Sequence, residues 1–254
     1  MKFYASISYD GSFFKGIAIQ PDQVTVKGAF DKVLSSFFHQ KVSMQLVSRT
    51  DKGVHAFDAR ISFEVTTKIP AIKIAQVLNP KLFKIQLNWV KEVGDDFVLQ
   101  NLPLSKEYLY QISTSKSYPF QESYLWNLEG WVFSETELQK VLNLFQGEHN
   151  FKNFCKVDHT RNITSFVRKI ESIRFEVVEN KLNIFIRGNG FLWMMVRYIV
   201  YAIVACLQGK IEKVNLQRLL GGESPSKQDL KCLRPAPAEG LYLYKTLDGN
   251  GFSL

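Results

Sequence analysis

One aspartate in the sequence stands where a carboxylate could act as a nucleophile or as a general base. Asp51 lies in the loop SRTDKGVH, residues 48–55, between two apolar runs and flanked by Arg49 and Lys52. Nearby positive charges favour the ionised form of a carboxylate, and Gly53 permits a sharp turn or the close approach of a ligand. An ionised carboxylate on a tight loop suits nucleophilic or general-base chemistry. From spacing alone, a turn aspartate in a surface ion pair is the more frequent case.

A second candidate is Arg197, which lies inside the apolar segment FLWMMVRYIVYAIVACL, residues 191–207. The segment is shorter than a typical membrane span, and an arginine inside it would be costly in lipid, so we expect a buried helix and no membrane. An unpaired guanidinium in apolar surroundings is expensive, and it should pair with a carboxylate or reach a phosphate or a cleft. A structural ion pair is one interpretation. Pairing with Asp51 would explain both residues together.

Two tyrosines could contact a nucleic-acid base. Tyr108 and Tyr110 are two residues apart on an expected strand, so their side chains share one face. Aromatic rings on a strand can stack on bases, as in RNA-binding sheets. Ordinary core packing is the competing interpretation.

The charge balance favours an anionic partner. Lysine and arginine outnumber aspartate and glutamate by 32 to 24, which gives a formal net charge of +8 and a pI near 9.3. Basic residues gather in residues 156–162 and at Arg168 and Lys169, where they could contact phosphates without reading sequence. A soluble surface with surplus lysine accounts for the same numbers.

The cysteines and histidines argue against disulfide and metal chemistry. Three cysteines stand far apart with no Cys-x-x-Cys pair, which indicates reduced thiols in a cytoplasmic protein. The four histidines show no metal-ligand spacing. The sequence therefore predicts neither a disulfide framework nor a metal site. The residues concerned are Cys155, Cys206, Cys232, His39, His55, His149 and His159.

Apolar residues at alternating or helical spacing predict the strands and helices that carry these candidate residues. In the first part of the chain they predict a strand, a helix, two strands, a helix and a strand, over residues 2–9, 26–38, 42–46, 61–65, 72–78 and 83–90. This order is the ferredoxin-like pattern, an antiparallel sheet with helices on one face. The candidate loop around Asp51 falls between the second and third of these strands.

The second part of the chain is also expected to contain both strands and helices, and one of these helices is longer than those of the first part. Ser134 and Glu137 form the sequence pattern of a capping box ahead of a helix that Gly147 ends. The other expected elements are strands over 108–112, 170–178, 182–187 and 241–244, the helix 191–207 and a short helix near residue 216. We therefore predict an α+β protein of two ferredoxin-like or RRM-like lobes, residues 1–104 and 105–254, with largely antiparallel sheets flanking a basic cleft.

Taken in order, these segments resemble the TruA family of tRNA pseudouridine synthases. The most specific match is SRTDKGVHA (48–56), which is similar to the catalytic loop of that family. Supporting matches run in family order along essentially the whole chain: YDG (9–11), KEYLY (106–110), GEHNF (147–151), GNGFLWMMVRYIV (188–200) and APAEGLYL (236–243).

The resemblance implies a role for each candidate. Asp51 would be the catalytic aspartate, and Arg49 would fill the space of a flipped-out base or contact the RNA. Tyr108 would lie against the target uracil, Arg197 would pair with Asp51, and Leu241 would line the pocket. The enzyme would detach uracil from C1′ of its ribose, rotate it and rejoin it through C5. Such enzymes extrude the target nucleotide, which suits an aromatic wall in basic surroundings.

The resemblance also implies partners. The reaction needs neither cofactor nor metal, and the substrate would be tRNA, held across a homodimer whose interface the second lobe would supply. The expected targets are the uridines at positions 38, 39 and 40 of the anticodon stem-loop.

The chain departs from the family pattern at several places outside the residues assigned to chemistry. Ile17 and Ala18 stand where the family usually has Trp-Gln, and Ala59 stands where a glutamine is usual. The run LNPKL (78–82) lacks the usual proline of that loop, and Gln100 replaces a common arginine. These departures bear on RNA handling and site choice rather than on the reaction.

Two other functions compete with this interpretation. A catalytically silent tRNA-binding or chaperone-like module on the same fold would not need Asp51, Tyr108 and Arg197 together. A hydrolase that cleaves a glycosidic bond in RNA usually needs two carboxylates, and the motifs hold no second acidic residue in a matching place.

Overall fold

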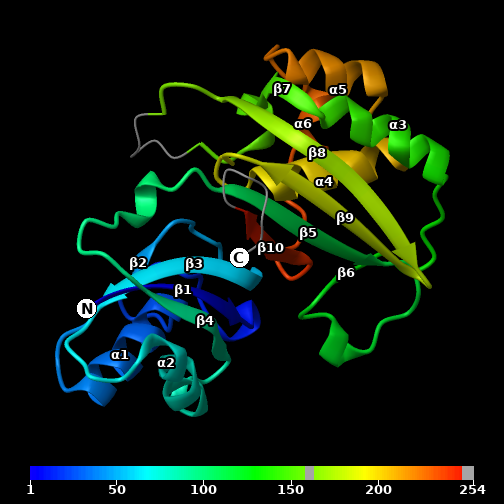
Figure 1. The fold of residues 1–254 in the computed structure, drawn as a ribbon. Helices are drawn as coiled ribbons and strands as arrows, with labels where there is room; N and C mark the ends of the chain where they lie inside the picture. Colours follow the sequence, from blue (N-terminus) through cyan, green and yellow to red (C-terminus); the bar gives the residue numbers. More distant parts are fainter. Residues whose placement is uncertain (158–162, 248–254) are drawn as a thin grey trace. The chain divides into compact units, whose positions relative to one another are not determined.

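The computed structural model describes residues 1–157 and 163–247, which form two compact units. The first unit contains residues 1–104 and the described end of the chain from Tyr242 onward, and the second contains Ser105–Leu241. Each unit is a mixed α+β arrangement built on a mostly antiparallel sheet (Figure 1). The expected α+β class is therefore confirmed.

The sheet of the first unit is centred on strand β1 (Lys2–Tyr9). It pairs antiparallel with β3 (His55–Glu64) on one side and with β4 (Ile85–Val93) on the other, and the short β2 (Gln45–Leu46) pairs antiparallel with β3. Helices α1 (Val26–Phe38) and α2 (Ala71–Leu78) lie on one face of this sheet (Figure 1). Three short 3-10 turns, Gly11–Phe13, Asn79–Lys81 and Leu99–Asn101, connect the elements.

The core of this unit follows from alternation along the strands. Phe3 of β1 lies opposite Phe63 of β3, and their ring centroids are 5.3 Å apart. The ring of Phe30 on α1 packs against Phe63 at 6.2 Å, which identifies the face that the helices cover. Thr25 caps α1 by accepting a hydrogen bond from the backbone N–H of Gly28 at 3.2 Å.

The last strand of the chain returns to the first unit. Strand β10 (Leu241–Leu247) runs parallel to β3, with Tyr242 opposite His55 and Leu243 opposite Ala56. The described residues 242–247 thus belong to the same compact unit as residues 1–104. The short β2 pairs with β3 only near Ser62 and leaves the edge at His55 open to another strand.

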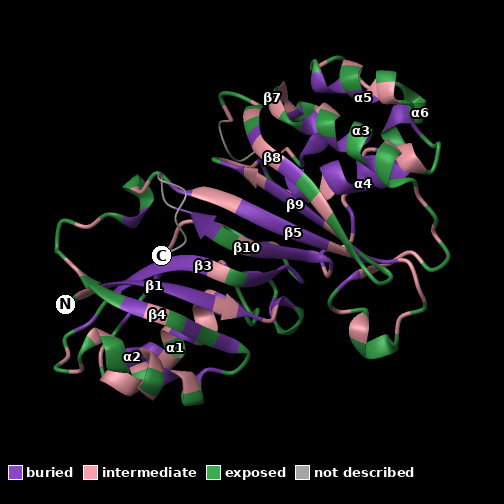
Figure 2. Cartoon of the chain, turned by 45° about the vertical axis from the view of Figure 1, so that its right-hand side comes forward, coloured by how far each residue is buried: buried purple, intermediate pink, exposed green. Residues whose placement is uncertain are grey.

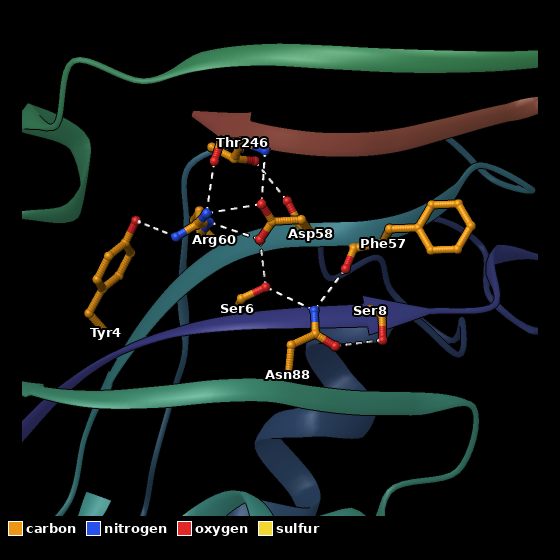
Figure 3. Close-up of polar contacts among 8 residues, drawn as sticks. All are labelled: Tyr4, Ser6, Ser8, Phe57, Asp58, Arg60, Asn88 and Thr246. Carbon is orange, nitrogen blue, oxygen red and sulfur yellow. Dashed lines mark hydrogen bonds and ion pairs between the residues drawn. The ribbon is translucent and has the colours of Figure 1, made fainter. Parts of the chain in front are cut away.

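A buried ion pair fastens β10 to β3 (Figure 3). The guanidinium of Arg60, whose side chain is 2% exposed, donates through Nη2 to Asp58 at 2.9 Å and to the carbonyl of Thr246 at 2.8 Å. Its Nε also lies 2.9 Å from Asp58 Oδ1, although the direction is poor for a hydrogen bond, so these atoms interact as charges. Asp58 accepts from the backbone N–H of Thr246 at 2.9 Å and from the hydroxyl of Ser6 at 2.6 Å.

Within the part of the chain that the structure describes, the second unit contains five strands and four helices. Its strands pair antiparallel in the order β5, β9, β8, β7, and β6 runs parallel to β5. Their bounds are β5 Ser105–Ser113, β6 Trp126–Asn127, β7 Gly147–Asn150, β8 Val167–Val178 and β9 Lys181–Gly188. The helices are α3 Glu135–Phe145, α4 Met195–Leu207, α5 Lys213–Leu220 and α6 Lys227–Leu230, with 3-10 turns at Pro119–Gln121 and Phe151–Phe154.

Helix α4 is the apolar segment of the sequence, and it is a core helix. Nine of its 13 residues are buried (Figure 2), and it packs against α3. It begins four residues later than the sequence predicts, because Met194 adopts a left-handed conformation with φ of 60° and separates residues 191–193 from the helix. Among the described residues, no helix has both the length and the apolar character needed to cross a bilayer.

The expected cap of α3 forms at Ser134, whose hydroxyl accepts from the backbone N–H of Glu137 at 3.3 Å. The carboxylate of Glu137 turns to two ammonium groups, Lys140 at 2.8 Å and Lys213 at the start of α5. The hydrogen bond from Lys140, followed by that from Lys213, lowers the pKa of Glu137 to about 2. This glutamate therefore links α3 to α5 in addition to supporting its own helix.

Candidate active site

The loop that carries Asp51 is held to the start of the chain. Thr50 is buried, and its hydroxyl forms a 2.7 Å hydrogen bond with the hydroxyl of Tyr9 at the end of β1. The carbonyl of Thr50 accepts from the backbone N–H of Ile17 at 3.3 Å. The carbonyl of Asp51 accepts from the backbone N–H of Val54 at 3.2 Å, which closes the turn through Gly53 at φ of +84°. Asp51 itself is half-buried.

Two glycines let the segment after β1 press against this loop. A Cβ on Gly11 would lie 2.1 Å from the carbonyl oxygen of Val54, and a Cβ on Gly16 would lie 3.0 Å from that of Thr50. Both neighbours are backbone atoms, so any side chain there would have to move the loop. The YDG motif and the SRTDKGVHA motif, about 40 residues apart in sequence, are therefore two sides of one packed structure.

We expect Gly11→Ala to misplace Asp51 without unfolding the protein. The added methyl group overlaps the Val54 carbonyl, and a displacement of about 1 Å at a catalytic group typically costs about a hundredfold in rate. Turnover of the substrate proposed below measures the effect, and far-UV circular dichroism checks the fold. Gly94→Ala is the matched control, because its nearest neighbour is the flexible carboxylate end of Asp96. Full activity of Gly11→Ala would show that the loop position does not matter.

His55 follows the loop and is buried at the first position of β3. Its Nδ1 accepts a hydrogen bond from the backbone N–H of Gly11 at 3.1 Å, so this nitrogen carries a lone pair. Asp10 Oδ1 lies 3.4 Å from the same nitrogen. We assign His55 a structural role: it joins the two motifs at the base of the loop.

Two cations belong to the loop, and a third, Lys15, precedes Gly16 where the chain approaches the loop. Arg49, Lys52 and Lys15 are all exposed. The side chain of Lys52 lowers the pKa of Lys15, first through a hydrogen bond and second through its like charge. Two ammonium groups held this close to each other are suited to a shared anion such as a phosphate.

The second unit contains Arg197 in the first turn of α4. Its Nε donates to the carbonyl of Ala236 at 2.7 Å, and its own carbonyl accepts from the backbone N–H of Ala236 at 3.0 Å. The side chain is half-buried. The sequence predicts that this guanidinium needs a polar partner, and the structure places it beside the backbone of the segment 236–241.

The two tyrosines of β5 are both buried, but their side chains contact different residues. Tyr108 packs edge-on against Phe191 with centroids 5.0 Å apart. Tyr110 donates its hydroxyl proton to the carbonyl of Pro237 at 2.7 Å, and burial raises the pKa of Tyr110 well above its usual value, partly offset by the charge of Arg197. Tyr110 is a core residue, while Tyr108 stays a candidate.

Leu241 ends the same segment. It is buried, and its backbone N–H donates to the carbonyl of Ala238 at 2.9 Å. Gly240 is required just before it, because a Cβ there would lie 2.8 Å from the ring of Tyr110 and from the carbonyl of Gln111. The segment thus brings Arg197, Tyr110 and Leu241 into one neighbourhood of the second unit, while Asp51 and Arg49 belong to the first.

The basic segment of the sequence analysis is described only in part, because residues 158–162 lie outside the described residues. The Nζ of Lys156 lies 4.4 Å over the ring of Trp193. Arg168 donates to the carbonyls of Ser165 and Val167, at 3.0 and 2.6 Å, and Lys169 is exposed. Arg168 therefore supports its own strand.

Within residues 1–157 and 163–247, no three side chains of histidine, cysteine, aspartate or glutamate come together as a possible metal site. The three cysteines carry free thiols.

Sequence reasoning missed several residues near the loop, namely Lys15, His55, Phe57 and Tyr242. The signals were present as a lysine four residues after the YDG motif and as alternating aromatic residues at 55 and 57 and at 242 and 244. What the sequence did not show is that these two aromatic runs are neighbours. The departures at Ile17 and Ala59 are absorbed by the core, since both residues are at most 2% exposed.

The sequence of the chain is similar to those of known proteins. The model of a family described as tRNA pseudouridine synthase matches residues 141–246. A protein of Malacoplasma penetrans named tRNA pseudouridine synthase A is 34% identical over 97% of this chain and 100% of its own. Proteins of the same name from Mycoplasmoides gallisepticum and Thermococcus kodakarensis are 33% and 35% identical, over 94% and 96% of this chain and 88% and 84% of theirs.

By class the chain is therefore a tRNA pseudouridine synthase, which is an isomerase. More narrowly, the chain belongs to the tRNA pseudouridine synthase A family.

Proposed function

We propose that this protein converts uridine to pseudouridine in the anticodon stem-loop of tRNA, at positions 38, 39 and 40. The observation that carries the proposal is the similarity, over 97% of the chain, to a protein named tRNA pseudouridine synthase A. The packing of the Asp51 loop supports it, because Tyr9, Gly11 and Gly16 hold the backbone of the loop while the side chain of Asp51 is half-buried. A fixed carboxylate beside cations is what a nucleophile or base on an RNA substrate requires.

The reaction conserves atoms and electrons within the substrate. The bond from N1 of uracil to C1′ of the ribose breaks, the base rotates, and C5 bonds to C1′. The proton on C5 is lost, and N1 gains one. No oxidant, reductant or transferred group enters the balance, so side chains alone suffice for the reaction as we propose it, with no cofactor or metal.

Each predicted residue has a place in the proposal. Asp51 is the catalytic residue, and Arg197, its guanidinium anchored on Ala236, is its ion-pair partner. Tyr108 lies against the uracil, and Leu241 lines the pocket. Arg49 enters the space that the flipped nucleotide leaves or contacts the RNA backbone.

The remaining parts of the proposal concern architecture and partners. We assign the two units to ferredoxin-like or RRM-like lobes of a pseudouridine synthase fold, flanking a basic cleft. Lys15 and Lys52 would contact a phosphate of the bound tRNA. The enzyme would act as a cytoplasmic homodimer that binds the anticodon stem-loop and the body of the tRNA.

The test uses unmodified tRNA transcripts with tritium at C5 of uridine, incubated with the wild-type protein. Forming the C1′–C5 bond expels the C5 hydrogen, so we expect released tritium from transcripts with uridine at 38, 39 or 40. Transcripts with cytidine at all three positions are the control and should release none.

Each other outcome assigns a different function. Tight tRNA binding with no tritium release from any transcript would overturn the proposal in favour of a silent binding module. Free uracil in the supernatant without pseudouridine in the RNA would indicate a glycosidic hydrolase. Release from the cytidine control transcripts would keep the chemistry and move the target positions.

A further inference from the structure

A β-bulge re-aims one aromatic side chain immediately after the catalytic loop. Along β1 and β3, Ile7 pairs with Ala59 but Tyr9 pairs with Ala56, so β3 has one residue more than β1 over this interval. Paired residues share a face of the sheet, which places Ala56 and Ala59 on the helix side and Phe57 on the opposite side. Bulges of this kind redirect side chains beside functional sites.

Phe57 ends a column of stacked rings on that face. The ring of Tyr242 stacks on His55 with centroids 4.7 Å apart and an interplanar angle of 21°, and on Phe57 at 5.4 Å and 17°. Tyr244 touches Phe57 edge-on at 5.9 Å. His55 and Tyr242 are buried, whereas Phe57 is 50% exposed. The column therefore begins in the base of the catalytic loop and ends at an open aromatic ring.

The backbone beneath this ring is held by hydrogen bonds (Figure 3). The carbonyl of Phe57 accepts from the side-chain amide of Asn88 at 2.7 Å, and Asn88 also accepts from the hydroxyl of Ser8 at 3.0 Å. The next residue, Asp58, is fixed by Arg60 and Thr246. An exposed phenylalanine on such a supported backbone loses little further freedom on binding, which favours it as a contact surface.

The charge around the column identifies the occupant. The exposed Lys245 has its Nζ 5.1 Å over the ring of Tyr244, the same ring that touches Phe57 edge-on. The carboxylate that follows Phe57 in the chain, Asp58, is already paired with Arg60. An open ring with a cation beside it matches an unpaired nucleobase with its phosphate, because bases stack on aromatic faces while ammonium groups contact the backbone.

We propose that Phe57 stacks on an unpaired nucleobase of the bound RNA and that Lys245 contacts the adjacent phosphate. This rests on the proposed function, since it names a binding site for the same substrate. The site extends the aromatic column of His55 and Tyr242 by one ring that the RNA supplies. It is independent of Tyr108, which would contact the target uracil.

Ring-specific variants of Phe57 test the proposal. Phe57→Leu keeps an apolar side chain but removes the stacking face, and Phe57→Trp keeps the face. We expect Phe57→Leu to weaken binding of an unmodified tRNA transcript about tenfold, the scale of one base–aromatic stack, and Phe57→Trp to bind within about twofold of wild type. Phe38→Leu on α1, on the other face of the sheet, is the matched control and should bind as wild type does. Binding is measured by filter retention at one fixed salt concentration.

Two results would overturn the proposal. Equal tRNA affinity of Phe57→Leu and wild type would exclude stacking. A change in sedimentation coefficient of Phe57→Leu, with wild-type affinity per tRNA, would show that the ring faces a second copy of the chain. The test is separable from that of the reaction: if the wild type binds tRNA but releases no tritium, the proposed function fails while the binding series still decides the role of Phe57.

Discussion

Asp51→Asn should reduce tritium release from uridine-containing tRNA by at least about a thousandfold, the scale on which loss of a catalytic nucleophile or base is felt. The amide has the same shape as the carboxylate, so the loop contacts through Thr50 and Val54 survive. It carries no negative charge and cannot accept a proton or attack. We expect tRNA affinity to stay within about threefold of wild type, because contacts with phosphate supply most of the affinity for RNA.

The control for this variant is Asp95→Asn, which removes a carboxylate from an exposed turn of the same unit. It should keep full activity. If Asp51→Asn retains more than a tenth of the wild-type rate, Asp51 is not the catalytic group. Activity lost together with the far-UV dichroism spectrum would instead indicate a structural role, which Asp51→Glu would then test separately by restoring the fold without the rate.

Asp58→Ala should destabilise the first unit by about 3 kcal/mol, as expected when one partner of a buried ion pair is removed. The guanidinium of Arg60, 2% exposed, would lose its counter-charge while still packed over the ring of Trp89 at 4.7 Å. The backbone N–H of Thr246 and the hydroxyl of Ser6 would lose their acceptor as well. Urea unfolding measures the change, and hydrogen exchange of the peptide 241–247 should show β10 opening first.

The double variant Asp58→Leu with Arg60→Met separates the charge effect from loss of shape. Replacing both members of a buried ion pair by apolar residues is often neutral or stabilising. The double variant should therefore regain most of the stability that Asp58→Ala loses. Asp95→Ala is the surface control and should change stability by less than about 0.5 kcal/mol. A cost below about 1 kcal/mol for Asp58→Ala would mean that water reaches Arg60 in solution.

Local patterns predicted most of the elements because their causes are local. The alternation in residues 2–9 and the helical spacing in 26–38 correspond to β1 and α1 with the same bounds. Ser134 caps α3 as its sequence position indicates. Strand β2 is shorter than expected and β3 longer, since pairing with β1 extends β3 back to His55, beyond its apolar stretch.

What the sequence did not reveal depends on partners far away in the chain. The parallel pairing of β10 with β3 joins residues 187 positions apart, such as Tyr242 and His55. The bulge at Phe57 depends on the register between two strands, which apolar periodicity does not report. The start of α4 depends on one left-handed residue, Met194, that no propensity would place there.

The sequence identified the candidate site residues but revealed few of their contacts. Asp51 was singled out by its charged neighbours, but the hydrogen bond between Thr50 and Tyr9 that holds its loop appears only in three dimensions. Tyr108 and Tyr110 were paired as possible base contacts, and their contacts distinguish them: Tyr108 packs against Phe191, and Tyr110 donates to the carbonyl of Pro237. Pairing of Asp51 with Arg197 stays a prediction.

The position of β10 in the chain has a consequence for biosynthesis. A ribosome adds roughly 5–20 residues per second, so β3 leaves the exit tunnel roughly ten to forty seconds before the strand that completes its edge. Throughout that interval the edge beside the Asp51 loop is an unsatisfied template for pairing with other nascent chains. A premature stop codon before residue 241 would make the exposure permanent. Translational errors in the codons of β10 would therefore be felt first at the Asp51 loop, which is encoded much earlier in the message.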